Sequence, residues 1–345
     1  MAEPRPLNLA LQGGGAHGAF AWGILDRLLE DGRFRFDGIA ATSAGAMNAV
    51  AVAQGLMAGG PEGARAELAG FWQAVSEAGR LYSPIRRLPW ETAQGWQFEP
   101  PASFALFDAF TRVVSPYQFN PLNLNPLRDI LNARVDFARL RAHSPVKLFL
   151  NATNVRNGRG RVFRNARIDA DVVMATACLP FLYQAVEIDG EAYWDGGYSG
   201  NPALYPLFYE CACGDVLLLP LNPLERQQVP DTGAEITDRI NEVSFNATLL
   251  AELRAVAFVQ KLIERDWLTD EARQRYRFVR VHVIRADEAL DDLGTSTKFA
   301  WEWPFLTGLR DLGRAAAAAW LVAHGDDVGI RPGVDLKAMF LDIDG

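Results

Sequence analysis

The first sixty residues alternate between two patterns of apolar positions. Residues 7–12 form a short, mainly apolar run, which is typical of a strand buried on both faces. Residues 16–30 carry apolar side chains three and four positions apart, which predicts a helix that Gly32 ends. A second short strand at 37–41 leads through a tight turn into a small-residue helix from about 44 to 58. This repeated order predicts a parallel sheet with helices packed on it.

The pattern becomes less regular further along the chain. Residues 61–80 are expected to be helical, whereas 81 to about 126 are rich in proline and aromatic residues and show no strand alternation. We expect an insertion there, with one helix over Ser103–Val114. The remaining predicted elements are two short helices in 127–142, a strand in 145–155 with a hairpin partner at 160–165, a small-residue helix at 169–178, a strand pair ending at Asp195, a buried strand at 215–223, a long amphipathic helix at 233–265, a strand at 276–285 and a mainly helical segment at 301–324. One α/β domain with an elaborated middle is the simplest account.

Composition and charge exclude several classes of protein. The 345-residue chain is long enough for a sizeable core, and its 49% apolar and 22% charged residues are ordinary for a globular protein. The net charge of −8 disfavours nucleic acid as a partner, so we interpret the arginines of 156–167 as a solvated hairpin face. No apolar run reaches the length of about 18 residues that spans a bilayer, and the first apolar stretch is too short for a signal peptide.

The cysteines point to an intracellular protein. The chain has three, Cys178, Cys211 and Cys213, and they do not form the pattern of a disulfide framework. Cys211 and Cys213 could bind a metal, but no second pair of cysteines or histidines lies at a suitable spacing. We therefore expect buried thiols, no metal and a cytoplasmic location.

A serine lies where the second predicted strand turns into a helix. The sequence Ala41-Thr42-Ser43-Ala44-Gly45 places small residues on both sides of the hydroxyl, as a nucleophile elbow requires. The helix that follows would direct its amide-rich end at the site. Ala41 replaces the first glycine of the usual G-x-S-x-G pattern, so the match is partial. The alternative is that Ser43 only caps the helix.

The glycine cluster after the first strand opens on the same predicted sheet edge. Gly13, Gly14 and Gly15 free their amides to converge on one point, which suits the oxyanion of an acyl transfer. A tight turn without a ligand is the simpler alternative. The spacing Gly13-x-Gly15-x-x-Gly18 also matches a dinucleotide fingerprint, with Asp37 as the ribose-binding acid. However, Asp37 starts the second strand rather than ending it, which disfavours an oxidoreductase.

A carboxylate completes the candidate chemistry. Asp195 precedes Gly196 and Gly197 in a loop after a short strand, where it could take the Ser43 proton. An aspartate that only forms local turn hydrogen bonds is the alternative. A histidine-containing triad is disfavoured, because His282 lies inside a predicted strand and His324 at a helix end. We expect His143 at the surface.

These pieces, in this order, resemble the patatin-like phospholipase family. The matching residues are Gly13-Gly14-Gly15-Ala16-His17-Gly18, Thr42-Ser43-Ala44-Gly45 and Asp195-Gly196-Gly197, with "ATACLPFLYQAVEIDGEAYWDGG" similar to the family's approach to its aspartate. The resemblance implies a three-layer α/β/α fold with a mostly parallel sheet. The whole chain, 1–345, would then be one domain: a catalytic core of about 7–220, the insertion at 81–126 and a helical part at about 232–345.

The resemblance also implies a mechanism without metal or cofactor. Ser43 would be the nucleophile, Asp195 the base and the amides of Gly13, Gly14 and Gly15 the oxyanion hole. His17, Gly18, Gly45, Gly196 and Gly197 would support these loops. Two positions depart from the family pattern: Ala41 stands where glycine is usual, and His17 where arginine or lysine is common.

We therefore expect a serine acyl hydrolase whose partner is a lipid ester or another acyl ester. It could also contact a membrane or lipid granule transiently. The 81–126 segment is either a lid or apolar entrance, or ordinary core decoration. A dinucleotide-binding oxidoreductase and a catalytically weak lipid-binding protein stay open as alternatives.

Overall fold

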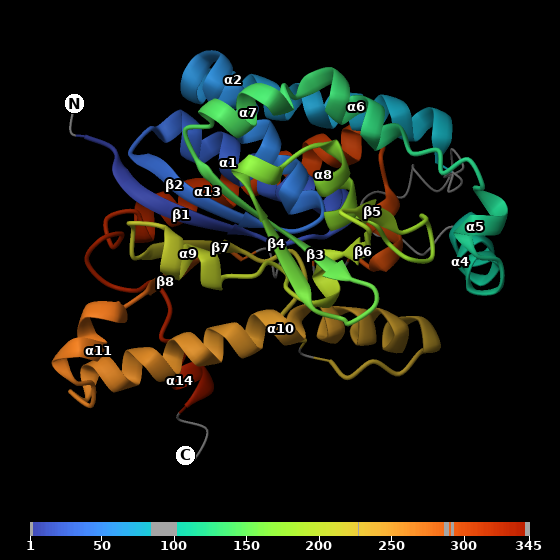
Figure 1. The fold of residues 1–345 in the computed structure, drawn as a ribbon. Helices are drawn as coiled ribbons and strands as arrows, with labels where there is room; N and C mark the ends of the chain where they lie inside the picture. The colour runs from blue at the N-terminus through green and yellow to red at the C-terminus, as the bar shows by residue number, and fades with distance from the viewer. Residues whose placement is uncertain (1–2, 84–101, 227, 286–289, 291–292, 342–345) are drawn as a thin grey trace.

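The central element of the molecule is one mixed β-sheet (Figure 1). The computed structural model describes residues 3–83, 102–226, 228–285, 290 and 293–341. Within them the strand order is β5-β6-β3-β2-β1-β7-β8, with β4 paired to β3 outside this path. The parallel strands are β1 (Arg5–Leu11), β2 (Phe34–Ala41), β3 (Lys147–Asn154), β7 (Asp215–Leu219) and β8 (Arg280–Val283). The antiparallel strands are β4 (Gly160–Arg164), β5 (Val186–Ile188) and β6 (Glu191–Asp195). The predicted mostly parallel α/β sheet is confirmed.

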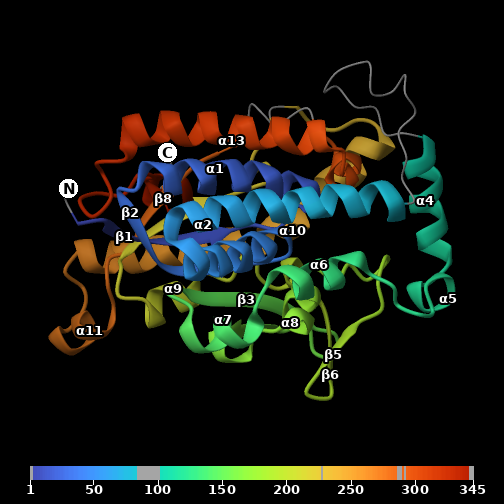
Figure 2. The ribbon, with the colours of Figure 1, turned by 90° about the horizontal axis from the view of Figure 1, so that it is seen from above.

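Helices cover both faces of this sheet, which gives the three layers that the family resemblance implied. On one face lie α1 (Gly18–Asp31), α2 (Ala44–Tyr82) and α13 (Trp303–His324), side by side in Figure 2. On the other lie α9 (Tyr205–Glu210), α10 (Gly233–Glu264) and α14 (Leu336–Phe340), as Figure 1 shows. The remaining helices are α4 (Ala102–Val113), α5 (Pro116–Phe119), α6 (Pro126–Arg134), α7 (Phe137–His143), α8 (Ala170–Thr176) and α11 (Asp270–Arg275), with short 3-10 turns η1 (Gly15–His17), η2 (Asn165–Arg167), η3 (Gly196–Tyr198) and η4 (Thr295–Phe299).

The central strands are mainly apolar because their side chains pack in two separate cores. Leu9 and Leu11 of β1 face the core under α1, α2 and α13, whereas Ala10 faces the smaller core under α10. Leu217 and Leu218 divide in the same way. Successive side chains of a strand point to opposite faces, so burial on both sides favours a mainly apolar run without alternation.

The helix boundaries follow the local signals in the sequence. Gly32 ends α1 in the left-handed conformation, at φ 73°, as its position predicts. The helices expected at 44–58 and 61–80 are two parts of α2, which leaves helical geometry at Gly59 and Gly60 just before Pro61. A proline cannot donate the missing hydrogen bond, and the glycines accept the kink at little steric cost.

The predicted insertion is described only in part. The helix expected over Ser103–Val114 is present as α4, and α5 follows it after one turn. These two helices stand at the edge of the molecule in Figures 1 and 2. Residues 84–101 of the insertion lie outside the described residues. The predicted strand at 276–285 is shorter than expected, because only Arg280–Val283 pair with β7.

Candidate active site

The carboxyl ends of the central parallel strands bring the glycine cluster and the serine turn together. Leu11, the last residue of β1, pairs with Ala41 at the end of β2 and with Leu219 at the end of β7. The residues that follow all three strands therefore share one sheet edge, where ligands of open α/β sheets bind. A Cβ built on Gly13 would lie 2.7 Å from the Ser43 Cβ, so the two loops are in direct contact.

Ser43 occupies a strained turn between β2 and α2. Its φ is +55° and its ψ −123°, a conformation that residues with a side chain rarely adopt. Ala41 remains within strand β2, so the turn does not need glycine there. A Cβ on Gly45 would collide with the Leu11 carbonyl, which explains the small residue after the elbow. The Ser43 side chain makes no capping hydrogen bond to α2, and this finding contradicts the helix-cap alternative.

The Ser43 side chain instead interacts with Asp195, which lies at the end of β6, and lowers the pKa of its carboxyl. Asp195 is 1% exposed, and its Oδ1 accepts the Gly197 N–H at 2.7 Å. Burial raises the pKa of Asp195 to about 7, although the Gly197 hydrogen bond, the Ser43 hydroxyl and the charge of Lys298 act in the opposite direction. A base with this pKa is suited to proton transfer near neutral pH.

Local turn bonds and polar side chains fix the Asp195 loop. The Asp195–Gly197 hydrogen bond has the geometry of an Asx turn, which is the local turn bond considered above as the alternative to a role as base. An Asp195 carboxyl held by this bond could still accept a proton. A Cβ on Gly196 would collide with the Asn151 carbonyl, and one on Gly197 with the Phe245 ring. The Asn151 Nδ2 donates to the Gly196 carbonyl at 2.8 Å, which ties this loop to β3.

Fewer amides of the glycine loop are available to a ligand than the sequence predicts. The Gly13 N–H donates to the Asn201 Oδ1 at 2.7 Å, so Gly13 is not a free oxyanion donor. In the described part of the chain, the amides of Gly14 and Gly15 have no acceptor. Gly15 has φ +58°, and a Cβ there would collide with the Lys298 carbonyl. Of the three glycine amides that the sequence suggests for an oxyanion hole, those of Gly14 and Gly15 therefore remain candidates.

Comparison with known proteins decides the family. The model of the family "Patatin-like phospholipase" matches residues 9–207, which is more than half of the chain. The chain belongs to the patatin-like phospholipase family. This membership places it among the lipid acyl hydrolases in general.

Individual relatives are distant from this patatin-like chain. None of the curated proteins matches it. The crystal structure of VipD from Legionella pneumophila is 15% identical with a TM-score of 0.37, over 90% of this chain and 67% of that one. Full-length ExoU in complex with SpcU, from the type III secretion system of Pseudomonas aeruginosa, is 16% identical with a TM-score of 0.32, over 93% of this chain. The patatin-like chain spans 54% of that second protein.

The dinucleotide alternative has no support at Asp37. Its Oδ2 accepts the amides of Ala212 and Cys213 at 2.8 and 3.1 Å, so the carboxylate fixes a turn before β7. Cys213 and Cys211 are buried thiols, as expected, and burial raises the pKa of both. In the described ranges, no helix has the length and apolarity needed to cross a membrane.

His17, in η1, is buried and contacts η4. It is 2% exposed, and its Nε2 lies 2.7 Å from the Thr297 hydroxyl. Burial and the nearby Lys298 charge lower the pKa of His17 to about 3, so the ring is neutral at physiological pH. It therefore connects η1 to η4. Gly18 lies beside it, and a Cβ there would be 2.8 Å from the Ala44 Cβ.

The other histidines of this patatin-like chain are engaged elsewhere. The His282 Nε2 lies 3.0 Å from the Asp215 carboxylate, at the start of β7 and hence at the opposite sheet edge from Ser43. The His324 Nδ1 lies 3.3 Å from Asp327. His143 is exposed at the end of α7, as expected. The arrangement thus pairs Ser43 with Asp195.

Four polar residues around the loops were not foreseen from the sequence: Asn151, Asn201, Asn222 and Lys298. The first two carried weak signals, since Asn151 interrupts an apolar strand and Asn201 closely follows the Asp-Gly-Gly turn. Asn222 and Lys298 carried none. They reach the glycine loop only through contacts across the fold.

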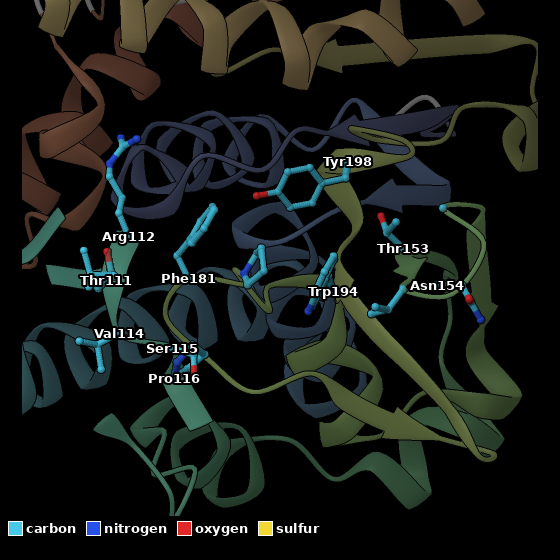
Figure 3. A pocket seen from close by; sticks show the side chains of 14 residues that line it. Thr111, Arg112, Val114, Ser115, Pro116, Thr153, Asn154, Phe181, Trp194 and Tyr198 are labelled. Atoms are coloured by element: carbon cyan, nitrogen blue, oxygen red, sulfur yellow. The ribbon is translucent and has the colours of Figure 1, made fainter. Parts of the chain in front are cut away.

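A cavity of about 640 Å³ lies between α4 and residues close to Asp195 in sequence. Trp194 and Tyr198, which flank Asp195 in sequence, line it together with Phe181. Figure 3 shows these three aromatic side chains opposite Thr111 and Arg112 of α4. Burial and the Asp195 charge raise the pKa of Tyr198 to about 12, so the phenol is neutral. A mainly apolar space of this size is suited to an apolar ligand.

Proposed function

We propose that this chain hydrolyses carboxylic esters of lipids through an acyl-enzyme on Ser43. The observation that carries the proposal is the strained Ser43 turn, whose hydroxyl interacts with a buried Asp195 with a pKa of about 7. Strain of this kind persists where the surrounding structure holds a functional group in place. Burial keeps the carboxylate poorly solvated and hence basic.

The first half of the reaction forms the acyl-enzyme. The Ser43 Oγ attacks the ester carbonyl carbon while its proton passes to Asp195. The amides of Gly14 and Gly15 stabilise the oxyanion of the tetrahedral intermediate. This intermediate expels the alcohol, which takes the proton from Asp195.

Water completes the cycle at the same site. It attacks the acyl-enzyme carbonyl and gives one proton to Asp195. The second tetrahedral intermediate then releases the fatty acid, and the Ser43 Oγ recovers the proton. No metal or other cofactor takes part in these steps.

The α4–α5 segment would form the entrance for the acyl chain. Residues 111–116 line one wall of the cavity, opposite Phe181. Exposed apolar side chains continue from this wall and would support transient contact with a lipid surface. These residues are Leu106, Phe110, Val113, Tyr117, Leu122 and Leu124.

Active-site labelling tests the proposal directly. The wild-type chain should react with a fluorophosphonate probe and turn over a panel of esters of graded chain length. Ser43→Ala should lose both signals while it keeps its circular dichroism spectrum. Labelling that persists in Ser43→Ala would place the nucleophile elsewhere. Lipid binding without labelling or turnover in the wild type would favour a non-catalytic lipid-binding protein.

A further inference from the structure

A lysine from the C-terminal part of the chain contacts the glycine loop. Lys298 belongs to η4, and its backbone carbonyl lies against the Cα of Gly15. Its Nζ donates a hydrogen bond of 2.6 Å to the Asn222 Oδ1. The Asn222 Nδ2 in turn donates to the Gly13 carbonyl at 3.3 Å. The cation is thus connected to the loop through one amide side chain.

Peptide geometry extends this connection to the Gly14 amide. In a planar trans peptide the Gly13 C=O and the Gly14 N–H point in opposite directions. A hydrogen bond that fixes the carbonyl toward Asn222 therefore fixes the N–H toward the other side of the loop. The Gly14 N–H has no acceptor among the described residues, so it is available to a ligand.

Asn222 is itself held firmly. Its backbone N–H donates to the Gln12 Oε1 at 2.8 Å, and the Gln12 Nε2 donates to the Asn246 Oδ1 at 2.8 Å. Because Asn222 is anchored in this way, its hydrogen bond to Lys298 also helps to fix its hydrogen bond to the Gly13 carbonyl. A charge-assisted bond to the Asn222 oxygen also polarises the amide, which makes its Nδ2 a stronger donor.

We propose that Lys298 acts through Asn222 as a positioning residue, which holds the Gly14 amide as an oxyanion donor. This role rests on the proposed hydrolase function. It assigns a task to a segment that lies more than one hundred residues after Asp195 in the chain. It also gives a reason for the contact between η4 and the glycine loop, which His17 and Thr297 reinforce.

Several charged groups lie near Lys298, and they indicate whose pKa should change when the lysine is removed. Asp195, Asp238 and Glu242 favour its charged form, whereas Arg226 and burial oppose it. Glu242 pairs with Arg226 and Arg239, and the Lys298 Nζ donates its hydrogen bond to Asn222.

Asp195 has its own set of neighbours. It accepts a hydrogen bond from the Gly197 N–H, interacts with the Ser43 hydroxyl and also faces Cys178 and Tyr198, which are neutral. Lys298 is thus the cation whose charge lowers the pKa of Asp195.

The experiment compares two variants that break the connection at different points. In Lys298→Met and in Asn222→Leu, kcat for a soluble short-chain ester should fall about tenfold to a hundredfold, with KM within about twofold of the wild type. The double variant should be no slower than the slower single variant, because both changes disrupt one unit. Lys298→Arg should recover part of kcat, and Lys261→Met on α10 is the matched control.

The pH profile separates positioning from general destabilisation. The acidic limb of kcat/KM should move to higher pH in Lys298→Met, because Asp195 loses a stabilising charge. The limb should stay in place in Asn222→Leu. A kcat within twofold of the wild type in folded Lys298→Met would overturn the proposal. If that variant does not fold, an unchanged kcat in Asn222→Leu would overturn it equally. Absent labelling of wild-type Ser43 would instead refute the hydrolase function itself.

Discussion

Gly15 is a position in the glycine loop that tolerates no side chain. Its positive φ disfavours any Cβ, and the Lys298 carbonyl occupies the space that the Cβ would need. Gly15→Ala should therefore displace the loop and lower kcat about a hundredfold or more, as loss of an oxyanion donor does. Ester hydrolysis and fluorophosphonate labelling measure this effect.

Gly32 provides the matched control for that substitution. It also has a positive φ, 73°, but nothing lies within 4 Å of a Cβ built there. Gly32→Ala should cost about 1 kcal/mol of stability through backbone strain and leave kcat unchanged. Equal losses of activity in the two variants would show that backbone strain alone, and not the loop geometry, controls the rate.

The buried Asp195 carboxyl predicts a pH dependence of stability as well as of the proposed activity. Its pKa is raised from 3.8 to about 7, so the folded chain holds this proton more tightly than the unfolded chain between those values. The stability that this proton contributes is therefore lost as the pH rises through about 7. Asp195→Asn removes the buried charge while its side-chain oxygen can still accept from Gly197.

We expect Asp195→Asn to lose activity but gain relative stability at alkaline pH. The loss in kcat should be about a hundredfold or more, in line with the contribution of a general base. The difference in Tm between the variant and the wild type should be larger at pH 8 than at pH 5. Thermal unfolding at both pH values measures it. A Tm difference that does not change with pH would show that Asp195 is not buried with a raised pKa.

At the scale of elements, local patterns in the sequence predict the strand–helix units and the turns that carry Ser43 and Asp195. Glycines, small residues and apolar runs determine these turns within a few positions of the chain. The glycine donors could be predicted only in part, because Asn201 takes the Gly13 amide from nearly two hundred residues away. Lys298 and Asn222 could not be predicted, since their roles arise from packing between segments that no local pattern connects.

Helix α4 provides a test of the proposed acyl entrance. Val113 lines the cavity and is 84% exposed, whereas Val322 on α13 is 91% exposed and distant from it in sequence. Val113→Asp should raise KM for a decanoyl ester roughly tenfold, because a charge in the apolar wall disfavours the chain. KM for an acetyl ester should not change, and Val322→Asp should affect neither. A uniform effect of Val113→Asp on both esters would contradict the entrance.

At the scale of the whole molecule, the two ends of the parallel strands carry different groups. Ser43 and the glycine loop follow the carboxyl ends, and a buried ionic cluster lies at the amino ends. In that cluster the Asp215 carboxylate accepts hydrogen bonds from Arg280 at 2.7 and 2.9 Å and from the Gly329 amide at 2.9 Å. His282 completes it. The cluster joins β7, β8 and the segment after α13.

This division predicts that His282 contributes to stability and not to catalysis. His282→Ala removes a fully buried ring that contacts Asp215 and packs against Trp320. Asp215 keeps its bonds to Arg280 and Gly329, so the loss should be limited to about 1–3 kcal/mol, which urea unfolding measures. The kcat of the folded variant should equal that of the wild type, because the ring is bound at the edge opposite Ser43. A large fall in kcat with unchanged stability would restore a histidine to the mechanism and remove the serine–aspartate dyad.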